Sequence, residues 1–232
     1  MRITAVLLTF GVFLFGGFCT EAETVRIVAD RDATLIEHPE GVWANGSGPF
    51  AFAGRTSQSI GSKRRLLLRF DVAGALPDHA SIERVSLTLY ATSGNPAPRM
   101  TSLHRVLADW AEGPSSASGG GGSPTEPGDT TWIHREFDDT LWAKPGGHFV
   151  ARASARGRVT ANDFQTWSDT RQLRHDVLLW NAAPSRNFGW ILLGDETEGQ
   201  TAKRFASRES PDPANRPVLE IEFSVSRSSG QR

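Results

Sequence analysis

The chain has 232 residues, with 25 lysines and arginines against 26 aspartates and glutamates, so its formal net charge is −1. This near-neutral balance argues against a dedicated nucleic-acid-binding protein, because such proteins carry a clear excess of cations to neutralise phosphates. The length fits two small domains or one large domain of the all-β kind.

Residues 1–22 have the pattern of a secretory signal peptide. A positive start is followed by the apolar run "ITAVLLTFGVFLFGGF" and by small residues before a cleavage point after Ala22. The run is short for a transmembrane anchor, which needs about 20 apolar residues. Acylation of Cys19 is a minor alternative. We expect a secreted protein, extracellular, at the cell surface or periplasmic, that meets a membrane only through the signal segment before cleavage. Cys19 is the single cysteine and leaves with that segment, so the mature fold depends on its core.

After the signal, short apolar runs bounded by Gly, Pro, Asn and Asp recur, and no stretch of a dozen residues keeps a helical period. The clearest predicted strands are 23–30, 83–92, 175–180, 188–195 and 216–225. Apolar and polar residues alternate most plainly in 83–92 and 216–225. The pattern predicts an all-β jelly-roll β-sandwich of two antiparallel sheets with at most one or two short helices. The segment "DFQTW" (163–167) is the candidate for a short helix or turn.

The Gly/Ser-rich segment 114–128 interrupts the strands. Its composition predicts a flexible loop that does not pack. We interpret it as an excursion within a single domain, 23–225, and expect 226–232 to be a disordered tail.

The segment "GSKRRLLLRFDV" (61–72) places four cations beside an apolar run. Alternation turns Leu66, Leu68, Phe70 and Val72 inward and leaves Lys63, Arg65, Leu67, Arg69 and Asp71 on the opposite, solvated face. Arg69 and Asp71 are then close enough to support each other. Lys63 and Arg64, at the start of the strand, are freer to meet a ligand.

An ordered series of motifs resembles the DNRLRE-domain family along nearly the whole mature chain. The motifs are "LLRFDV" (67–72), "LPDHASIERVSLTLY" (76–90), "HRVLADWAEG" (104–113), "TTWIHREF" (130–137), "LWAKPGGHF" (141–149), "DVLLWNAAPSRNFGWILLGDE" (176–196), "RFASRES" (204–210) and "ANRPVLEIEF" (214–223). The resemblance implies a secreted jelly-roll sandwich, found alone or attached to polysaccharide-degrading enzymes. Some members resemble carbohydrate-binding modules for acidic polysaccharides such as alginate. The chain departs from the family in its long Gly/Ser loop and in carrying no attached catalytic domain.

Catalytic signals are weak. No G-x-S-x-G, H-E-x-x-H or P-loop pattern occurs, and acidic loop residues alone do not define a glycosidase. A polysaccharide lyase needs a base beside a charge-neutralising side chain, and Tyr90, His134 and Arg135 are the candidates. A lone tyrosine on a strand is more often a packing residue, so we expect no enzyme activity.

Metal-binding signals are also limited. The six histidines show no paired spacing typical of zinc. Asp30, Asp32 and Glu37 gather at a predicted strand start and could give oxygen ligands to a structural calcium ion, whereas ordinary turn chemistry explains them equally. We expect no other cofactor.

The seven tryptophans divide into two groups. Six lie in the family-like motifs or the 163–167 piece and are expected to be buried. The seventh, Trp43, lies in a Gly-rich loop and is expected to be exposed. An exposed indole can stack on the apolar face of a pyranose while Arg or Lys pairs with carboxylates. The predicted ligand contacts are Trp43, Arg55, Lys63, Arg64 and Arg135, with the alternative that these are unremarkable loop residues.

These observations favour a non-catalytic module that binds a polysaccharide, with an anionic one the first candidate, by stacking and Arg/Lys pairing. One alternative is a structural or adhesive module at the cell surface or in a matrix, with a protein partner. A small polysaccharide lyase is the less favoured alternative.

Overall fold

The computed structural model describes residues 22–92 and 94–225. The predicted signal peptide, apart from Ala22, and the predicted tail 226–232 lie outside the described residues. Ala22 pairs with Ser224, so the two ends of the described chain lie side by side. Within the described residues no helix is both long and apolar enough to cross a membrane.

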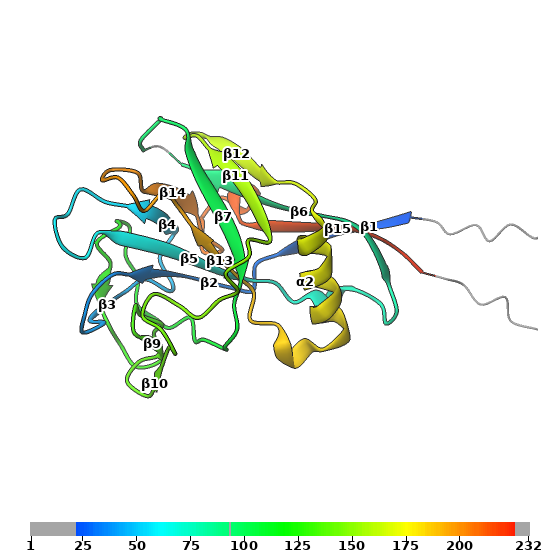
Figure 1. Cartoon of the computed structure of the whole chain (residues 1–232), viewed down its shortest axis with the longest axis horizontal. Coiled ribbons are helices and arrows are strands. Elements are labelled where there is room, and N and C mark those ends of the chain that lie inside the picture. Colours follow the sequence, from blue (N-terminus) through cyan, green and yellow to red (C-terminus); the bar gives the residue numbers. More distant parts are fainter. Residues whose placement is uncertain (1–21, 93, 226–232) are drawn as a thin grey trace, which may run out of the picture.

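Antiparallel strands dominate the molecule (Figure 1). Eleven strands form a connected system in the order β1-β15-β6-β14-β4-β5-β13-β7-β11, with β12 beside β6 and β2 beside β5. Its strands are β1 (Ala22–Val28), β2 (Arg31–Ile36), β4 (Phe50–Arg55), β5 (Lys63–Arg69), β6 (Ser81–Ala91), β7 (Arg99–Arg105), β11 (Ala155–Val159), β12 (Asp163–Trp167), β13 (Trp190–Leu193), β14 (Lys203–Ala206) and β15 (Val218–Ser224). Two small ribbons pair β3 (Trp43–Ala44) with β8 (Ser123–Pro124) and β9 (His134–Glu136) with β10 (Thr140–Leu141). The helices are α1 (Val72–Ala75), α2 (Arg171–Ala182) and the single 3₁₀ turns η1 (Pro184–Arg186) and η2 (Pro213–Asn215). The all-β sandwich with two short α-helices is therefore confirmed.

Strand β4 links the two layers of the sandwich. Phe50–Ala53 pairs with β14 in one layer, and Gly54 and Arg55 pair with β5 in the other. Gly54 has φ of +120°, and a Cβ there would lie 2.8 Å from the Cα of Ala202. Only glycine readily adopts this φ and leaves room for the Ala202 backbone, so Gly54 is what allows β4 to pass from one layer to the other.

The main core fills the space between the layers. Leu68, Leu87, Trp190 and Phe205 are fully buried in it, on strands from both layers. The inward face of β6 follows the predicted alternation, since Val85, Leu87 and Leu89 are all fully buried. Burial of this apolar area is the main source of stability for a domain without disulfides.

A second, smaller core lies on the outer side of β2, β5 and β13. Leu67 and Ile191 pack there against Trp110 and Trp132, which come from the segment that crosses this face. The prediction that Leu67 lies on a solvated face is therefore wrong, because Leu67 is fully buried in this second core. Arg65 is also covered, because it pairs with Glu196 at 2.7 Å and its guanidinium lies 4.7 Å from the Trp132 ring centroid.

The segment 175–180, predicted as a strand, belongs to helix α2. Leu173, Val177 and Trp180 are fully buried at helical spacing, whereas Leu178 is 50% exposed. The Thr170 side chain caps the helix by accepting from the backbone N–H of Leu173. Four consecutive apolar residues, Val177 to Trp180, have the pattern of a buried strand, but only one face of the helix that they form is buried.

The segment 163–167, predicted as a helix or turn, is strand β12, which pairs with β6. Trp167 and Gln165 turn inward, while Phe164 turns outward and is 50% exposed. Alternation was present in these five residues, but the run was too short to separate from a turn.

The end of the 63–72 segment also differs from the prediction. Leu66, Leu68, Phe70 and Val72 all turn inward as expected, but Val72 reaches the main core as the first residue of α1 and not as part of the strand. Arg69 pairs with Asp30, not with Asp71. Asp71 instead caps α1 by accepting a hydrogen bond from the Gly74 N–H at 3.1 Å.

The Gly/Ser-rich segment 114–128 packs against the body of the domain, which contradicts the prediction that it does not. Ser115 and Asp129 are buried. Asp129 accepts hydrogen bonds from the backbone N–H groups of Ser115 at 3.0 Å and Glu126 at 2.6 Å. The segment has few large side chains, but it is still ordered because its backbone N–H groups donate to the buried Asp129 carboxylate.

Candidate functional site

A two-residue ribbon brings Trp43 to the surface. Trp43 lies opposite Pro124 in the pairing of β3 with β8. Neighbouring residues of a strand face opposite ways, so Ala44 is buried while 37% of Trp43 is exposed. The other six tryptophans are at most 8% exposed. Both tryptophan predictions are confirmed.

Trp43 borders a surface groove formed by loops after β2 and β4. One part of the groove is lined by Trp43, Gln58, Arg64 and Gly121, and the adjoining part by Trp132, Ile133 and Pro145. Both parts share Glu37, His38, Pro39, Ile60 and Gly61, which makes them continuous. We call this feature the Trp43 groove.

The Trp43 groove combines apolar surface with a few polar groups. Ile60 is 82% exposed and stands beside the rim on which Trp43 lies. Gln58, His38 and Glu37 place an amide, an imidazole and a carboxylate along the same lining. Apolar surface with a few placed hydrogen-bonding groups is the usual composition of a ligand site. Sequence reasoning singled out Trp43 but missed Gln58, His38 and Ile60, because only the fold brings their loops together.

Arg64 is a structural residue beneath the groove, and the prediction that it is free to meet a ligand is wrong. Its side chain is buried, and its guanidinium donates to the carbonyls of Gly61 and Lys63 and to Oε1 of Gln58, each at 2.8 Å. It also donates to the Gly120 carbonyl. Burial lowers the pKa of Arg64 to about 10, so the side chain still carries its charge at neutral pH.

The other two predicted cations near the groove also have partners within the chain. Lys63 pairs with Glu37 at 3.3 Å, and its backbone N–H donates to the same carboxylate at 2.9 Å. Partial burial disfavours the Glu37 charge, but the bonds from Lys63 outweigh it and lower the pKa of Glu37. Arg55 donates to Ser62 Oγ at 2.8 Å and to the Thr197 carbonyl at 3.4 Å. These contacts shape the loops.

Arg135 lies elsewhere. It donates to the carbonyls of Asp109 at 2.7 Å and Leu141 at 3.3 Å. It borders a different depression, which it shares with Arg31 and Asp109. The five predicted ligand residues therefore do not form one site. Trp43 and Arg64 line the same groove, Lys63 and Arg55 support its loops, and Arg135 is separate.

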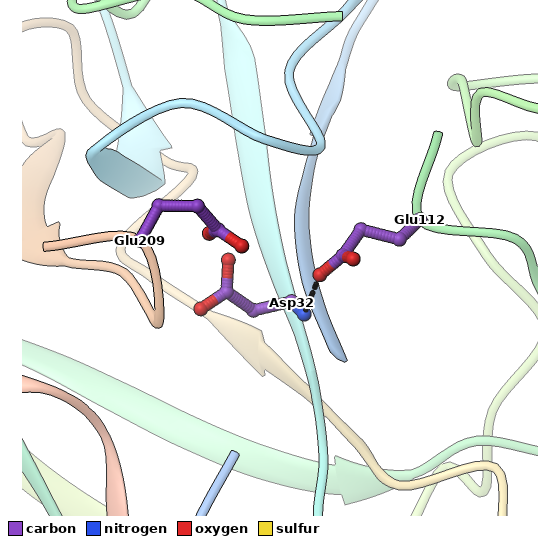
Figure 2. Close-up of side chains that lie close together, drawn as sticks. All are labelled: Asp32, Glu112 and Glu209. Carbon is purple, nitrogen blue, oxygen red and sulfur yellow. Dashed lines mark hydrogen bonds between the residues drawn. The ribbon is translucent and has the colours of Figure 1, made fainter. Parts of the chain in front are cut away.

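The three acidic residues predicted as calcium ligands do not come together. Asp30 pairs with Arg69, and Glu37 pairs with Lys63. Asp32 is buried and joins two other carboxylates instead. Glu112 and Glu209 lie on either side of it (Figure 2), and the ligand atoms of the three residues are within 4.8 Å of one another. Glu112 lies 80 positions from Asp32, so no local spacing could have indicated the cluster.

Arg208 neutralises much of this acidic cluster. Its guanidinium bonds to Glu112 at 2.6 Å and to Glu209 at 2.9 Å, and its backbone N–H donates to Asp32 at 2.7 Å. Burial and the nearby Glu209 charge raise the pKa of Asp32, and burial raises the pKa of Glu209. A calcium ion needs six to eight oxygen ligands, and here it would compete with a guanidinium for the same carboxylates. The arrangement is that of an internal ion-pair network in which Arg208 bonds to all three acidic residues.

The candidate lyase residues have different neighbours. The Tyr90 ring packs on Phe164, with centroids 5.0 Å apart. The His134 ring packs on Phe137 at 5.1 Å, and its Nδ1 lies 3.0 Å from Thr131 Oγ1. Each of these rings makes a packing contact of its own, on β6 and β9 respectively.

Neither a scan against models of protein families nor a search of curated proteins finds a match for this chain. The resemblance to the DNRLRE-domain family therefore rests on the quoted motifs.

Proposed function

We propose that this chain is a secreted, non-catalytic polysaccharide-binding module, and that Trp43 is the residue on which a sugar ring stacks. The observation that carries the proposal is the exposure of Trp43, alone among the seven indoles, on the rim of a groove. Aromatic rings have a large apolar face, which matches the C–H face of a pyranose. Gln58 and His38 supply hydrogen-bonding groups for the sugar hydroxyls.

The groove is held in shape before any ligand arrives. Arg64 ties Gly61, Gln58 and Gly120 together from beneath, so the loops on both sides of Trp43 are joined. Preorganisation lowers the ordering cost of binding. Because Arg64 and Lys63 are engaged in these internal contacts, stacking and hydrogen bonding account for binding at the groove.

The experiment is affinity electrophoresis of the mature chain, 23–232, in gels that contain neutral or acidic polysaccharides. We expect retardation by at least one glycan, and we expect Trp43→Ala to weaken it at least about tenfold, or about 1.4 kcal/mol. Trp43→Phe keeps a ring and should retain most of the binding. Phe164→Ala is the matched control, because Phe164 is an exposed aromatic residue outside the groove. Equal loss in Trp43→Ala and Phe164→Ala, or no retardation of the unmodified chain, would overturn the proposal.

A second candidate function is a structural or adhesive module with a protein partner. The observation in its favour is the apolar part of the same groove, where Ile60 is 82% exposed beside Pro39 and Pro145. Exposed apolar surface of this kind often marks protein contacts. A chain that is retarded by no glycan would favour this function. A rise in ultraviolet absorbance on mixing with a uronic acid polymer would instead indicate a lyase, and we expect none.

A further inference from the structure

Three arginines surround a shallow pocket between β11 and the start of α2. Arg152, Arg156 and Arg171 line it, together with Ser154, Thr170 and Gln172. All three arginines are exposed. Within the described part of the chain, none of the three guanidinium groups has a hydrogen-bond or carboxylate partner. We call this feature the arginine pocket.

The floor of the arginine pocket is fixed from below. Ser154 Oγ and Gln172 Nε2 both donate to the buried carboxylate of Asp176, at 2.5 and 3.1 Å. Arg105 and Trp190 Nε1 each bond to the same carboxylate at 3.0 Å. The Asp176 charge is therefore compensated within the core, and the lining keeps the full positive charge of its three arginines.

Helix stability does not explain Arg171. It is the first residue of α2, and no acidic residue lies in the first helical turn. A cation at a helix N-terminus is unfavourable, because the helix dipole is positive there. The nearest acid in sequence, Asp169, pairs with Arg174 at 3.6 Å. An anionic ligand would compensate this charge arrangement.

We propose that the arginine pocket binds the oxyanion groups of an acidic glycan, either carboxylates or sulfate esters, at a site separate from the Trp43 groove. Guanidinium groups recognise such oxyanions by paired, charge-assisted hydrogen bonds. The pocket and the groove share no lining residue. Figure 1 places β3 and α2 on different sides of the molecule. The inference rests on the proposed function only in naming a glycan as the carrier of the charge.

A fourth arginine, Arg158 on β11, favours a linear polymer as the ligand over a single small ion. Arg156 and Arg158 are both exposed and lie on the same face of the strand, two positions apart. The strand rise sets their Cα atoms about 7 Å apart. Arg158 likewise has no hydrogen-bond or carboxylate partner among the described residues. A row of cations can meet successive charged groups of one chain. The lining holds no aromatic ring on which a nucleic-acid base could stack.

The test compares two triple variants of the mature chain that lose the same charge. One is Arg152→Ala/Arg156→Ala/Arg171→Ala. The control is Arg26→Ala/Arg84→Ala/Arg186→Ala, three exposed arginines outside the pocket. Affinity electrophoresis at low and high salt uses a polyuronate, a sulfated glycan, a neutral glucan and single-stranded DNA, and thermal unfolding checks that each variant is folded. A Lys triple variant at the same pocket positions keeps the charge without the guanidinium fork.

The pocket variant should bind the polyuronate or the sulfated glycan at least tenfold more weakly at low salt and with a smaller salt dependence. The control variant should match the unmodified chain, and the Lys variant should recover part of the affinity. The glycan that responds identifies carboxylate or sulfate as the ligand. Equal losses in both triple variants, no loss in the pocket variant, or equal binding of DNA would overturn the inference.

Trp43→Ala separates this inference from the proposed function. Salt-sensitive binding of an acidic glycan that survives in Trp43→Ala and disappears in the pocket variant supports the arginine pocket even if the groove binds nothing. Binding that is lost in Trp43→Ala and unchanged in the pocket variant supports the groove alone and overturns the pocket.

Discussion

The guanidinium of Arg64 and the backbone carbonyl of Gly120 are joined by a hydrogen bond across 56 positions of sequence. Gly120 lies in the segment 114–128, and Arg64 lies near the start of the central strand β5, so this bond attaches the Gly/Ser-rich segment to the sandwich. A Cβ at Gly120 would lie 3.4 Å from the Phe52 ring, which shows how closely the segment approaches the sheet. Arg64, which the sequence suggested as a ligand contact, therefore has a structural role: it holds the segment 114–128 against the sheet.

Arg64→Ala should destabilise the fold. The carbonyls of Gly61, Lys63 and Gly120 would lose their donor in a buried place, and we expect a loss of about 2–4 kcal/mol in the free energy of unfolding. Lys63→Ala is the control, because its partly exposed pair with Glu37 should contribute less than about 1 kcal/mol. Urea unfolding measures both. Equal and small effects would contradict the structural role of Arg64.

Asp129 should be the residue that orders the segment 114–128. Its carboxylate is buried and accepts from the N–H groups of Ser115 and Glu126. Asp129→Ala leaves both donors unpaired, so we expect a loss of about 2–4 kcal/mol and new cleavage within 114–128 by a protease of broad specificity. Asp129→Asn keeps one acceptor oxygen and should be cleaved more slowly. Rapid cleavage of the unmodified chain within this segment would show that the carboxylate does not order it.

The sequence predicted correctly which residues are buried in strands with one buried and one exposed face. It failed for strands that are covered on both faces. Strand β6 alternates between buried and partly exposed residues, so Val85, Leu87 and Leu89 could be assigned to the core. The middle of β5 is covered on both sides, because Trp132 and its neighbours form a second core over Leu67. A face that another segment covers cannot be recognised from alternation alone.

The candidate site was predictable only in its aromatic part. Trp43 lies in a Gly-rich loop outside the family-like motifs, and on that ground the sequence predicted it at the surface. Partners of charged residues come from distant segments, as Glu112 does for Asp32, so sequence could not separate engaged from unengaged cations. The prediction selected Arg64, which has internal hydrogen bonds, and overlooked Arg156, which has no hydrogen-bond or carboxylate partner among the described residues.

Trp43 should account for nearly all tryptophan fluorescence that an aqueous quencher can reach. All seven tryptophans lie in the described residues, and the other six are at most 8% exposed. We expect acrylamide to quench a minor fraction of the emission, and we expect Trp43→Phe to remove that fraction. A glycan bound in the groove should protect the same fraction. Unchanged quenching in Trp43→Phe would mean that another indole is accessible.

The acidic cluster gives the unfolding free energy a pH dependence of known sign. Asp32 and Glu209 share a buried space beside Glu112 (Figure 2), and burial raises the pKa values of Asp32 and Glu209. The folded chain therefore keeps a proton to higher pH than the unfolded chain does. Where the folded state binds more protons, the free energy of unfolding falls as pH rises.

Asp32→Asn should remove the share of this dependence that comes from Asp32. The amide oxygen can still accept from the Arg208 N–H, but residue 32 no longer ionises. Urea unfolding from pH 4 to pH 8 should show the unmodified chain losing stability relative to Asp32→Asn as pH rises, because only the former must bury a carboxylate. Glu37→Gln is the control of opposite sign. Bonds from Lys63 lower the pKa of Glu37, so its stabilisation is present above the ordinary glutamate pKa and is lost as pH falls through the lowered value. Parallel curves for the unmodified chain and Asp32→Asn would mean that Asp32 is ionised in the folded protein at every pH tested, with Arg208 as its counter-ion.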